Sequence, residues 1–308
     1  MKREIIVIAG PTAVGKTEYA IETALEFDGE IVSCDSMQLY KYMDIGSAKP
    51  TATERARVKH YLVDEIDPGE AFSVAKYQTL AKAAIEEIFA KGKTPVIAGG
   101  TGLYLNSLLY DMDFSAPPRN DSFRETLFEE AELLGPEYLY EKLQSVDPAA
   151  ASRIHPNNVK KVVRALEAAE EGKPVKAFSS CQTPTTEYDA RLVCLTRNRA
   201  ELYDRINRRV DILVEQGLFD EVENLLEMGL GEADISMKGI GYKEIIGYFD
   251  DLYTKDEAID LVKRNTRHLA KRQLTWFKRY ENMKWFNLSE LASQADALEE
   301  IFKWLREK

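Results

Sequence analysis

The segment Gly10-Pro11-Thr12-Ala13-Val14-Gly15-Lys16-Thr17 lies between an apolar, β-branched stretch at residues 4–9 and a helical pattern that runs through Leu25. Its GxxxxGK[ST] spacing in this strand–loop–helix context is typical of a P-loop and disfavours a chance glycine turn. The glycines let backbone N–H groups face phosphate oxygens, Lys16 adds a cation, and the Thr17 hydroxyl can ligate Mg²⁺. We therefore expect all eight residues to bind a diphosphate or polyphosphate group, with Thr17 as the metal ligand.

Two further strand patterns, at residues 30–34 and 94–98, are separated by helical periodicity over residues 74–90. Strands that alternate with helices predict an α/β fold, here a P-loop core with a parallel sheet flanked by helices. Ligands of such sheets bind beyond the carboxyl ends of the strands. The P-loop, residues 35–38 and the glycine-rich residues 99–102 are therefore expected to lie close together.

The pattern changes after Asp113, where Pro117-Pro118 interrupts the chain and helical periodicity replaces the strand signals. A second interruption follows at Gly172-Lys173-Pro174, before a β-like run at residues 190–195. We therefore expect a helical insertion domain at residues 115–185, and a P-loop catalytic core made of residues 1–114 and 186–308 that ends in basic helices.

Composition restricts the class of protein. The 308 residues carry a net charge of -11, which argues against a uniformly basic surface that binds nucleic acid. The apolar stretch at residues 5–9 is too short for a signal peptide or a membrane span, so we expect a cytoplasmic protein that does not enter a membrane. The odd number of widely spaced cysteines, Cys34, Cys181 and Cys194, supports neither a disulfide framework nor a zinc site.

Asp35 follows the strand pattern at residues 30–34, where a P-loop enzyme can place a carboxylate for a metal ion or for an acceptor group. The alternative is that Asp35 is a helix N-cap or a turn residue. The strand pattern at residues 94–98 ends instead in Gly99-Gly100-Thr101-Gly102, which suggests a second surface for close backbone approach.

Three stretches are locally basic despite the acidic total. Between Asp256 and Trp285 an apolar stripe at helical spacing is accompanied by a cationic face. Solvated surface is the usual role of such charges, but three runs with interleaved aromatic residues make a nucleic-acid contact plausible. The stripe comprises Ile259, Val262, Thr266, Leu269, Gln273 and Trp276; the cations are Arg264, Arg267, Lys271 and Lys278, then Lys160, Lys161 and Arg164, then Arg197, Arg199, Arg205, Arg208 and Arg209.

These motifs together resemble the tRNA dimethylallyltransferase family, also called tRNA isopentenyltransferases. The P-loop alone occurs in many families, whereas the blocks at residues 35–40 and 271–276 are far more specific. The eukaryotic members carry a C-terminal zinc finger for which this sequence has no ligands, so the bacterial type is the better match. The matching blocks, in order along nearly the whole chain, are residues 10–17, 35–40, 46–50, 99–104, 154–157, 164–167, 239–242 and 271–276.

The resemblance implies transfer of a dimethylallyl group from dimethylallyl diphosphate to the exocyclic amine of the adenine just 3′ of the anticodon in tRNA. The P-loop and Mg²⁺ would then stabilise the leaving diphosphate. The catalytic residues would be Asp35 as the base, Thr101 as a hydroxyl near the reacting centre, and Arg209 as the arginine that faces the diphosphate. Spacing alone leaves Arg208 open as an alternative to Arg209.

The resemblance also implies a tRNA surface that binds the anticodon stem-loop and holds the flipped adenine. We expect the enzyme to act as a monomer. The implied tRNA-binding residues are Asp35, Ser36, Met37, Gln38, Thr101, Arg124, Lys160, Lys161, Val162, Val163, Arg164, Lys238, Gly239, Ile240, Gly241, Tyr242, Lys243, Lys271, Arg272, Trp276 and Lys278.

Three other functions fit parts of the sequence. A P-loop small-molecule kinase would bind ATP at residues 10–17 and use Asp35 on the metal or the acceptor. A nucleotide-dependent RNA-binding protein would lack transfer chemistry. A prenyltransferase acting on free adenine nucleotides would need no extended grip on phosphates, so the basic stretches argue against it.

Overall fold

The computed structural model describes residues 3–112, 121–172 and 183–307. The chain forms two compact units, one of residues 1–109 with 186–308 and one of Tyr110–Thr185. The second unit starts at Tyr110, earlier than the predicted residue 115. The reason is that Tyr110 already forms a β-bridge with Pro184, near the end of the same unit. Pro117, Pro118, Lys173, Pro174 and Cys181, which entered the sequence interpretation, lie outside the described residues.

The first unit is built on a parallel sheet, as predicted, with the strand order β3-β2-β4-β1-β5-β6. The central strands are continuous buried runs because helices cover both faces of the sheet. The strands are β1 (Arg3–Ala9), β2 (Gly29–Cys34), β3 (His60–Tyr61), β4 (Thr94–Gly99), β5 (Tyr188–Thr196) and β6 (Lys284–Asn287). β2 and β4 match the strand patterns at residues 30–34 and 94–98.

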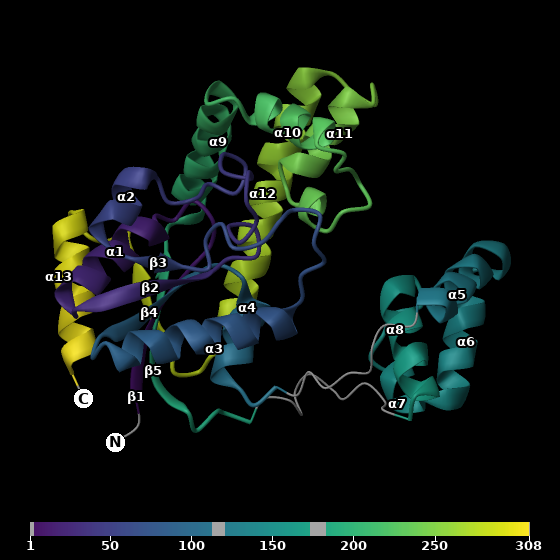
Figure 1. Cartoon of the computed structure of the whole chain (residues 1–308), viewed down its shortest axis with the longest axis horizontal. Coiled ribbons are helices and arrows are strands. Elements are labelled where there is room, and N and C mark those ends of the chain that lie inside the picture. The colour runs from purple at the N-terminus through teal and green to yellow at the C-terminus, as the bar shows by residue number, and fades with distance from the viewer. Residues whose placement is uncertain (1–2, 113–120, 173–182, 308) are drawn as a thin grey trace. The chain divides into compact units, whose positions relative to one another are not determined.

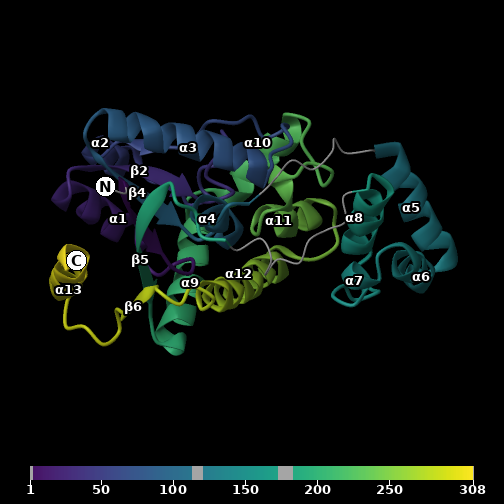
Figure 2. The same ribbon diagram turned by 90° about the horizontal axis from the view of Figure 1, so that it is seen from below.

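Helices α1 and α13 cover one face of the sheet, and α3 and α4 cover the other (Figures 1 and 2). α3 begins and ends where its periodicity predicted, since Ser73 caps its N-terminus by accepting from the Lys76 amide. The helices are α1 (Lys16–Glu26), α2 (Ala52–Arg57), α3 (Val74–Ala90), α4 (Gly102–Leu109), α9 (Arg199–Glu215), α10 (Leu218–Glu227), α11 (Tyr242–Phe249), α12 (Lys255–Phe277) and α13 (Gln294–Arg306), with a 3₁₀ turn, η2 (Ser236–Lys238).

Helix α12 contains all six positions of the predicted apolar stripe, from Ile259 to Trp276. A capping box of Thr254 and Glu257 starts it, and it ends at Phe277. Trp285 then pairs with Cys194 in the register of β6 on β5. The segment after α12 therefore forms an edge strand of the sheet. Among the described helices, none is both long and apolar enough to cross a lipid bilayer.

The second unit is helical, with α5 (Asp121–Leu134), α6 (Pro136–Val146), α7 (Pro148–Ala151) and α8 (Val159–Glu170). It has its own core, in which Leu139, Leu143 and Val162 are fully buried. Its two ends meet at a bridge between Tyr110 and Pro184, where the Asp111 amide donates to the Thr183 carbonyl at 2.9 Å.

Candidate active site

A cavity of about 1030 Å³ opens beyond the carboxyl ends of β1, β2 and β4 in the first unit. Its wall includes Lys16 of the P-loop, Asp35 after β2, Thr101 after β4 and Arg209 of α9. The three loops expected to meet at this edge of the sheet therefore share one cavity, because parallel strands bring their carboxyl ends together.

The P-loop has the backbone shape of an anion cradle. Gly15 has φ +111° and Ala13 has φ +62°, so both lie in the left-handed region that turns successive amides toward one side. Lys16 Nζ donates to the Pro11 carbonyl at 2.8 Å. Two arginines brace the loop from α9 and the turn before it: Arg205 Nε donates to the Ala13 carbonyl at 3.0 Å, and Arg197 Nε to the Val14 carbonyl at 3.2 Å.

Asp35 and Thr101 occupy the ends of two adjacent strands. Cys34 pairs with Gly99 in the β2–β4 register, and the Thr101 amide donates to the Cys34 carbonyl at 3.1 Å. The Thr101 hydroxyl accepts from the Ser36 amide at 3.1 Å, while Asp35 Oδ1 accepts from the Met37 amide at 2.9 Å.

Asp35 is therefore a turn residue, which was the alternative interpretation, and it also lines the cavity. The Asx-type turn engages only one of its carboxylate oxygens with the residues that the structure describes. Cys34 beside it is buried, and burial raises the pKa of its thiol to about 12. The thiol is thus a packing group, whereas the Asp35 carboxylate lines the cavity.

Two cations surround Asp35. Burial lowers the pKa of Lys16 to about 8, with the Asp35 carboxylate opposing the shift and Arg209 adding to it. Burial also lowers the pKa of Arg209, again opposed by Asp35. An anionic ligand in the cavity would relieve this arrangement, because it would compensate two partly desolvated positive charges.

Helix α12 joins the two glycine-rich turns through one side chain. Gln273 Oε1 accepts from the Thr12 amide at 2.9 Å, and Gln273 Nε2 donates to the Gly100 carbonyl at 3.0 Å. Trp276 lies against Gly102, where an added Cβ would come within 2.2 Å of the indole ring. The predicted apolar stripe of α12 thus lines the cavity at Gln273 and Trp276 instead of facing only the core.

The chain matches the IPP transferase family over residues 38–280. It is 53% identical to the tRNA dimethylallyltransferase of Alkaliphilus oremlandii (strain OhILAs), over 98% of this chain and 97% of that protein. It is 48% identical to the one from Clostridioides difficile (strain 630), over 99% and 98% of the two chains. The chain belongs to the IPP transferase family. The resemblance inferred from its motifs is therefore confirmed.

Crystal structures of family members have the same fold. The full-length tRNA isopentenylpyrophosphate transferase of Bacillus halodurans aligns with a TM-score of 0.75 at 41% identity, covering 99% of this chain and 96% of that one. A eukaryotic dimethylallyltransferase described as acting on tRNA aligns with a TM-score of 0.83 at 28% identity, covering 97% of this chain and 78% of that one.

The expected diphosphate residues of this IPP transferase divide into two groups. Thr12, Ala13, Gly15, Lys16 and Thr17 line the cavity. Gly10, Pro11 and Val14 are not among the lining residues and are buried. For these three, binding to the diphosphate stays a prediction, and any contact would be made by backbone groups because Gly10 has no side chain and those of Pro11 and Val14 are buried.

The choice between the two arginines of α9 follows from their positions. Arg209 lines the cavity, whereas Arg208 is exposed and forms an ion pair with Asp204 one turn earlier on the helix. Arg209 is therefore the arginine available to an anion in the cavity.

Most of the expected tRNA-facing residues in the first unit lie at the cavity or on the surface. Ser36, Met37, Gln38, Ile240, Gly241, Arg272 and Trp276 line the cavity, and Lys238, Lys243, Lys271 and Lys278 are exposed. Gly239 contacts Met37, where an added Cβ would lie 2.5 Å from the Met37 methyl carbon.

Tyr242 is a correction to that set. Its side chain is fully buried, and its hydroxyl donates to Glu221 at 2.8 Å. It therefore packs inside the protein and does not offer an aromatic face to a nucleic acid.

The second unit also corrects part of the expected tRNA surface. Val162 and Val163 are buried in its core, so their side chains serve packing. Arg124 makes a bidentate ion pair with Glu167, in which Nη2 and Oε2 lie 2.6 Å apart. Lys160, Lys161 and Arg164 are exposed on α8 and remain the cationic face of this unit.

Sequence reasoning missed two polar residues of the first unit. Gln273 was assigned to the apolar stripe, and Glu221 was assigned no role. Glu221 accepts from the backbone amides of Asp44, Ile45 and Gly46 at 2.7, 2.6 and 2.9 Å. A polar residue inside an otherwise apolar helical stripe was the available signal for Gln273; Glu221 had none.

Proposed function

We propose that this protein transfers a dimethylallyl group from dimethylallyl diphosphate to the exocyclic amine of the adenine adjacent, on the 3′ side, to the anticodon of tRNA. One observation carries the proposal: Asp35 and Thr101 share a single cavity with Lys16 and Arg209. One cavity thus offers a carboxylate that can act as a base for the adenine amine. It also offers cations that can bind the departing diphosphate. Similarity to a tRNA dimethylallyltransferase and to a eukaryotic dimethylallyltransferase described as acting on tRNA supports the same activity.

In the proposed reaction the allylic C–O bond breaks and a bond forms between the same carbon and the adenine amine. The electron pair of the broken bond leaves with the diphosphate, and the P-loop amides, Lys16 and Arg209 stabilise the developing negative charge. Asp35 accepts the proton that the amine loses, because an adenine amine is a weak nucleophile without a nearby base. The Thr101 hydroxyl, held by the Ser36 amide, orients the amine beside Asp35.

Mg²⁺ is the proposed cofactor, and the donor set suits it. The described residues contain no cluster of three or more His, Cys, Asp or Glu side chains that could form a protein cage for a metal. Mg²⁺ is commonly held by one or two protein oxygens together with substrate phosphates and waters. Thr17 and Asp35 both line the cavity and could supply those oxygens. When bound, the ion would neutralise charge on the leaving diphosphate.

We further propose that exposed basic side chains bind the tRNA anticodon stem-loop and offset the cost of flipping the adenine, which is a few kcal/mol. In the first unit these are Lys271, Arg272 and Lys278 at the end of α12. In the second unit they are Lys160, Lys161 and Arg164 of α8. The proposed enzyme acts as a monomer in the cytoplasm, where its tRNA substrate is found.

The decisive experiment follows a carbon label. Dimethylallyl diphosphate labelled in its carbon skeleton is incubated with the protein, Mg²⁺ and either tRNA or AMP. We expect label on tRNA alone, and Asp35→Ala should bind tRNA normally while losing nearly all transfer. Label on AMP alone would contradict the tRNA assignment, and movement of the ATP γ-phosphate to an acceptor would instead support a kinase.

A further inference from the structure

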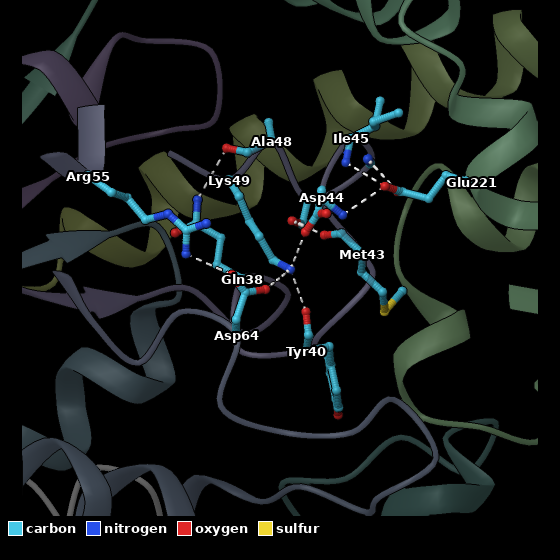
Figure 3. A network of polar contacts seen from close by, with 12 residues as sticks. Gln38, Tyr40, Met43, Asp44, Ile45, Ala48, Lys49, Arg55, Asp64 and Glu221 are labelled. Atoms are coloured by element: carbon cyan, nitrogen blue, oxygen red, sulfur yellow. Dashed lines mark hydrogen bonds and ion pairs between the residues drawn. The ribbon is translucent and has the colours of Figure 1, made fainter. Parts of the chain in front are cut away.

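The loop that precedes α2 is held by an unusual acceptor. Glu221 of α10 places both carboxylate oxygens in a turn of the loop: Oε2 accepts from the Asp44 and Ile45 amides, and Oε1 accepts from the Gly46 amide (Figure 3). Oε1 also accepts from the Tyr242 hydroxyl at 2.8 Å. Three successive backbone N–H groups form a concavity that normally binds an anion. Here the protein supplies that anion itself.

The opposite end of the loop is fixed by Lys49. Its side chain is only 4% exposed, and Nζ donates to the Tyr40 carbonyl at 2.6 Å and to Asp44 Oδ1 at 2.7 Å (Figure 3). It also forms an ion pair with Asp64, which in turn pairs with Arg55. Because Asp44 and Asp64 neutralise its charge, Lys49 stabilises the conformation of the loop.

The loop connects this clamp to the candidate reaction centre. Residues 44–50 line the same cavity as Asp35. The Ala48 carbonyl accepts from Gln38 Nε2 at 3.4 Å, and Gln38 Oε1 accepts from the Ser33 hydroxyl at 2.9 Å. The contacts thus run from Glu221 through the loop to the segment that begins at Asp35.

Glu221 itself does not line the cavity, as far as the described residues define its wall. Gly46 explains how closely the parts fit, because an added Cβ there would lie 2.6 Å from the Tyr242 ring. Any movement of α10 relative to the loop would therefore break several hydrogen bonds and move the cavity wall.

We propose that Glu221 is a positioning residue for the transfer reaction. It holds residues 44–46 so that the cavity wall and Gln38 keep the acceptor adenine in line with Asp35. This inference rests on the proposed function, and it assigns the residue a role that acts entirely through the loop.

The test compares Glu221→Ala with Glu223→Ala, an exposed glutamate on the same helix. In Glu221→Ala we expect kcat for transfer to fall roughly 10- to 100-fold, because a small displacement of a reacting group has effects of that size. The Kd for tRNA, measured separately by filter binding, should stay within about twofold. Glu223→Ala should match the unaltered protein in both measurements.

Chemical rescue adds a readout that a general loss of structure would not produce. Glu221→Ala leaves three backbone amides facing the space of the lost carboxylate. Added formate should bind there and raise the kcat of this variant several-fold. Chloride at the same ionic strength serves as the control. Glu221→Gln, which keeps the shape but faces donors with an NH₂ group, should not recover activity with formate.

Two results would overturn the positioning role alone: transfer by Glu221→Ala at the unaltered rate, or a loss of kcat matched by an equal loss of tRNA binding without formate rescue. The second result would identify Glu221 as a stability residue only. Failure of the unaltered protein to label tRNA would instead overturn the proposed function, so the two failures are distinguishable.

Discussion

The two glycine-rich turns of the cavity use glycine for different physical reasons. In the P-loop, Gly15 adopts φ +111°, a conformation that side chains with a Cβ rarely take, and the turned backbone presents amides to the cavity. In the turn after β4, glycines are needed because neighbours come close: an added Cβ would lie 2.1 Å from the Cys34 carbonyl oxygen at Gly99 and 2.4 Å from Gln273 at Gly100.

The proposed function requires this sheet edge to serve two reactants, and the two turns differ in a way that fits it. The first turn is shaped for an anion, and the second is shaped to let α12 and the end of β2 approach closely. Gln273 links them by bonding to one backbone group of each turn. If this division holds, changes in the first turn will affect diphosphate binding, and changes in the second will affect the acceptor side.

The largest expected effect comes from Lys16→Ala. Removing the P-loop cation should lower kcat for transfer by about 10²- to 10³-fold, since leaving-group stabilisation is lost. Titration calorimetry with inorganic diphosphate should show weakened binding, while tRNA affinity stays unchanged. Equal weakening of tRNA binding would mean that the first turn also serves the acceptor.

Gly102→Ala should have the next largest effect. The new Cβ would lie 2.2 Å from Trp276, and overpacking of this kind costs about 1–3 kcal/mol of stability. We expect kcat/KM with tRNA to fall about tenfold, with the Kd for inorganic diphosphate unchanged. Trp276→Leu in the same chain should restore thermal stability by removing the clash. A diphosphate defect as large as that of Lys16→Ala would show that the turns are not separate.

The pH dependence of diphosphate binding sharpens the assignment of the first turn. The pKa of Lys16 is lowered to about 8, chiefly by burial, so its cation is present below that pH and is lost above it. Affinity for inorganic diphosphate should therefore fall by up to tenfold per pH unit above about pH 8.

Lys16→Arg provides the reference for that experiment, because a guanidinium stays protonated throughout the range. Titration of the ligand is common to both proteins and cancels in the difference between their binding curves. Identical pH profiles would exclude Lys16 as the titrating group.

Lys271→Glu should give the smallest effect. Lys271 is exposed on α12, the helix that the second turn contacts. Charge reversal should weaken tRNA binding a fewfold and make the slope of log K against log salt shallower by about 1. Lys303→Glu, at an exposed position of α13, is the matched control. If both variants show the same salt slope as the unaltered protein, this face of α12 is only solvated.

The parts of the site that were predictable have local signals. The P-loop, Asp35 and Thr101 each follow a strand pattern, and strand ends in a parallel sheet meet at one edge whatever the remaining sequence does. Helical periodicity predicted α3, and the alternation of strand and helix patterns predicted the sheet. β3 and β6 were missed because two- and four-residue strands are too short to show periodicity and depend on pairing with β2 and β5.

The parts that were not predictable depend on partners distant in sequence. Arg124 and Lys160 look alike as basic residues, but only Arg124 meets a buried glutamate, Glu167. Tyr242 was expected in the tRNA-binding surface, but its hydroxyl donates a hydrogen bond to Glu221 inside the protein. Hydrogen bonds and ion pairs between residues distant in sequence produce no periodic pattern. The sequence therefore shows a charged or aromatic side chain but not its partner.

The bridge between Tyr110 and Pro184 has a consequence for how such a chain can change. Because the helical unit leaves and rejoins the chain at neighbouring points, a short turn across that bridge would bypass the unit without rerouting any strand. An insertion, deletion or replacement between these two residues can therefore alter the helical unit as a whole. It need not alter the register of the sheet or the residues at its edge.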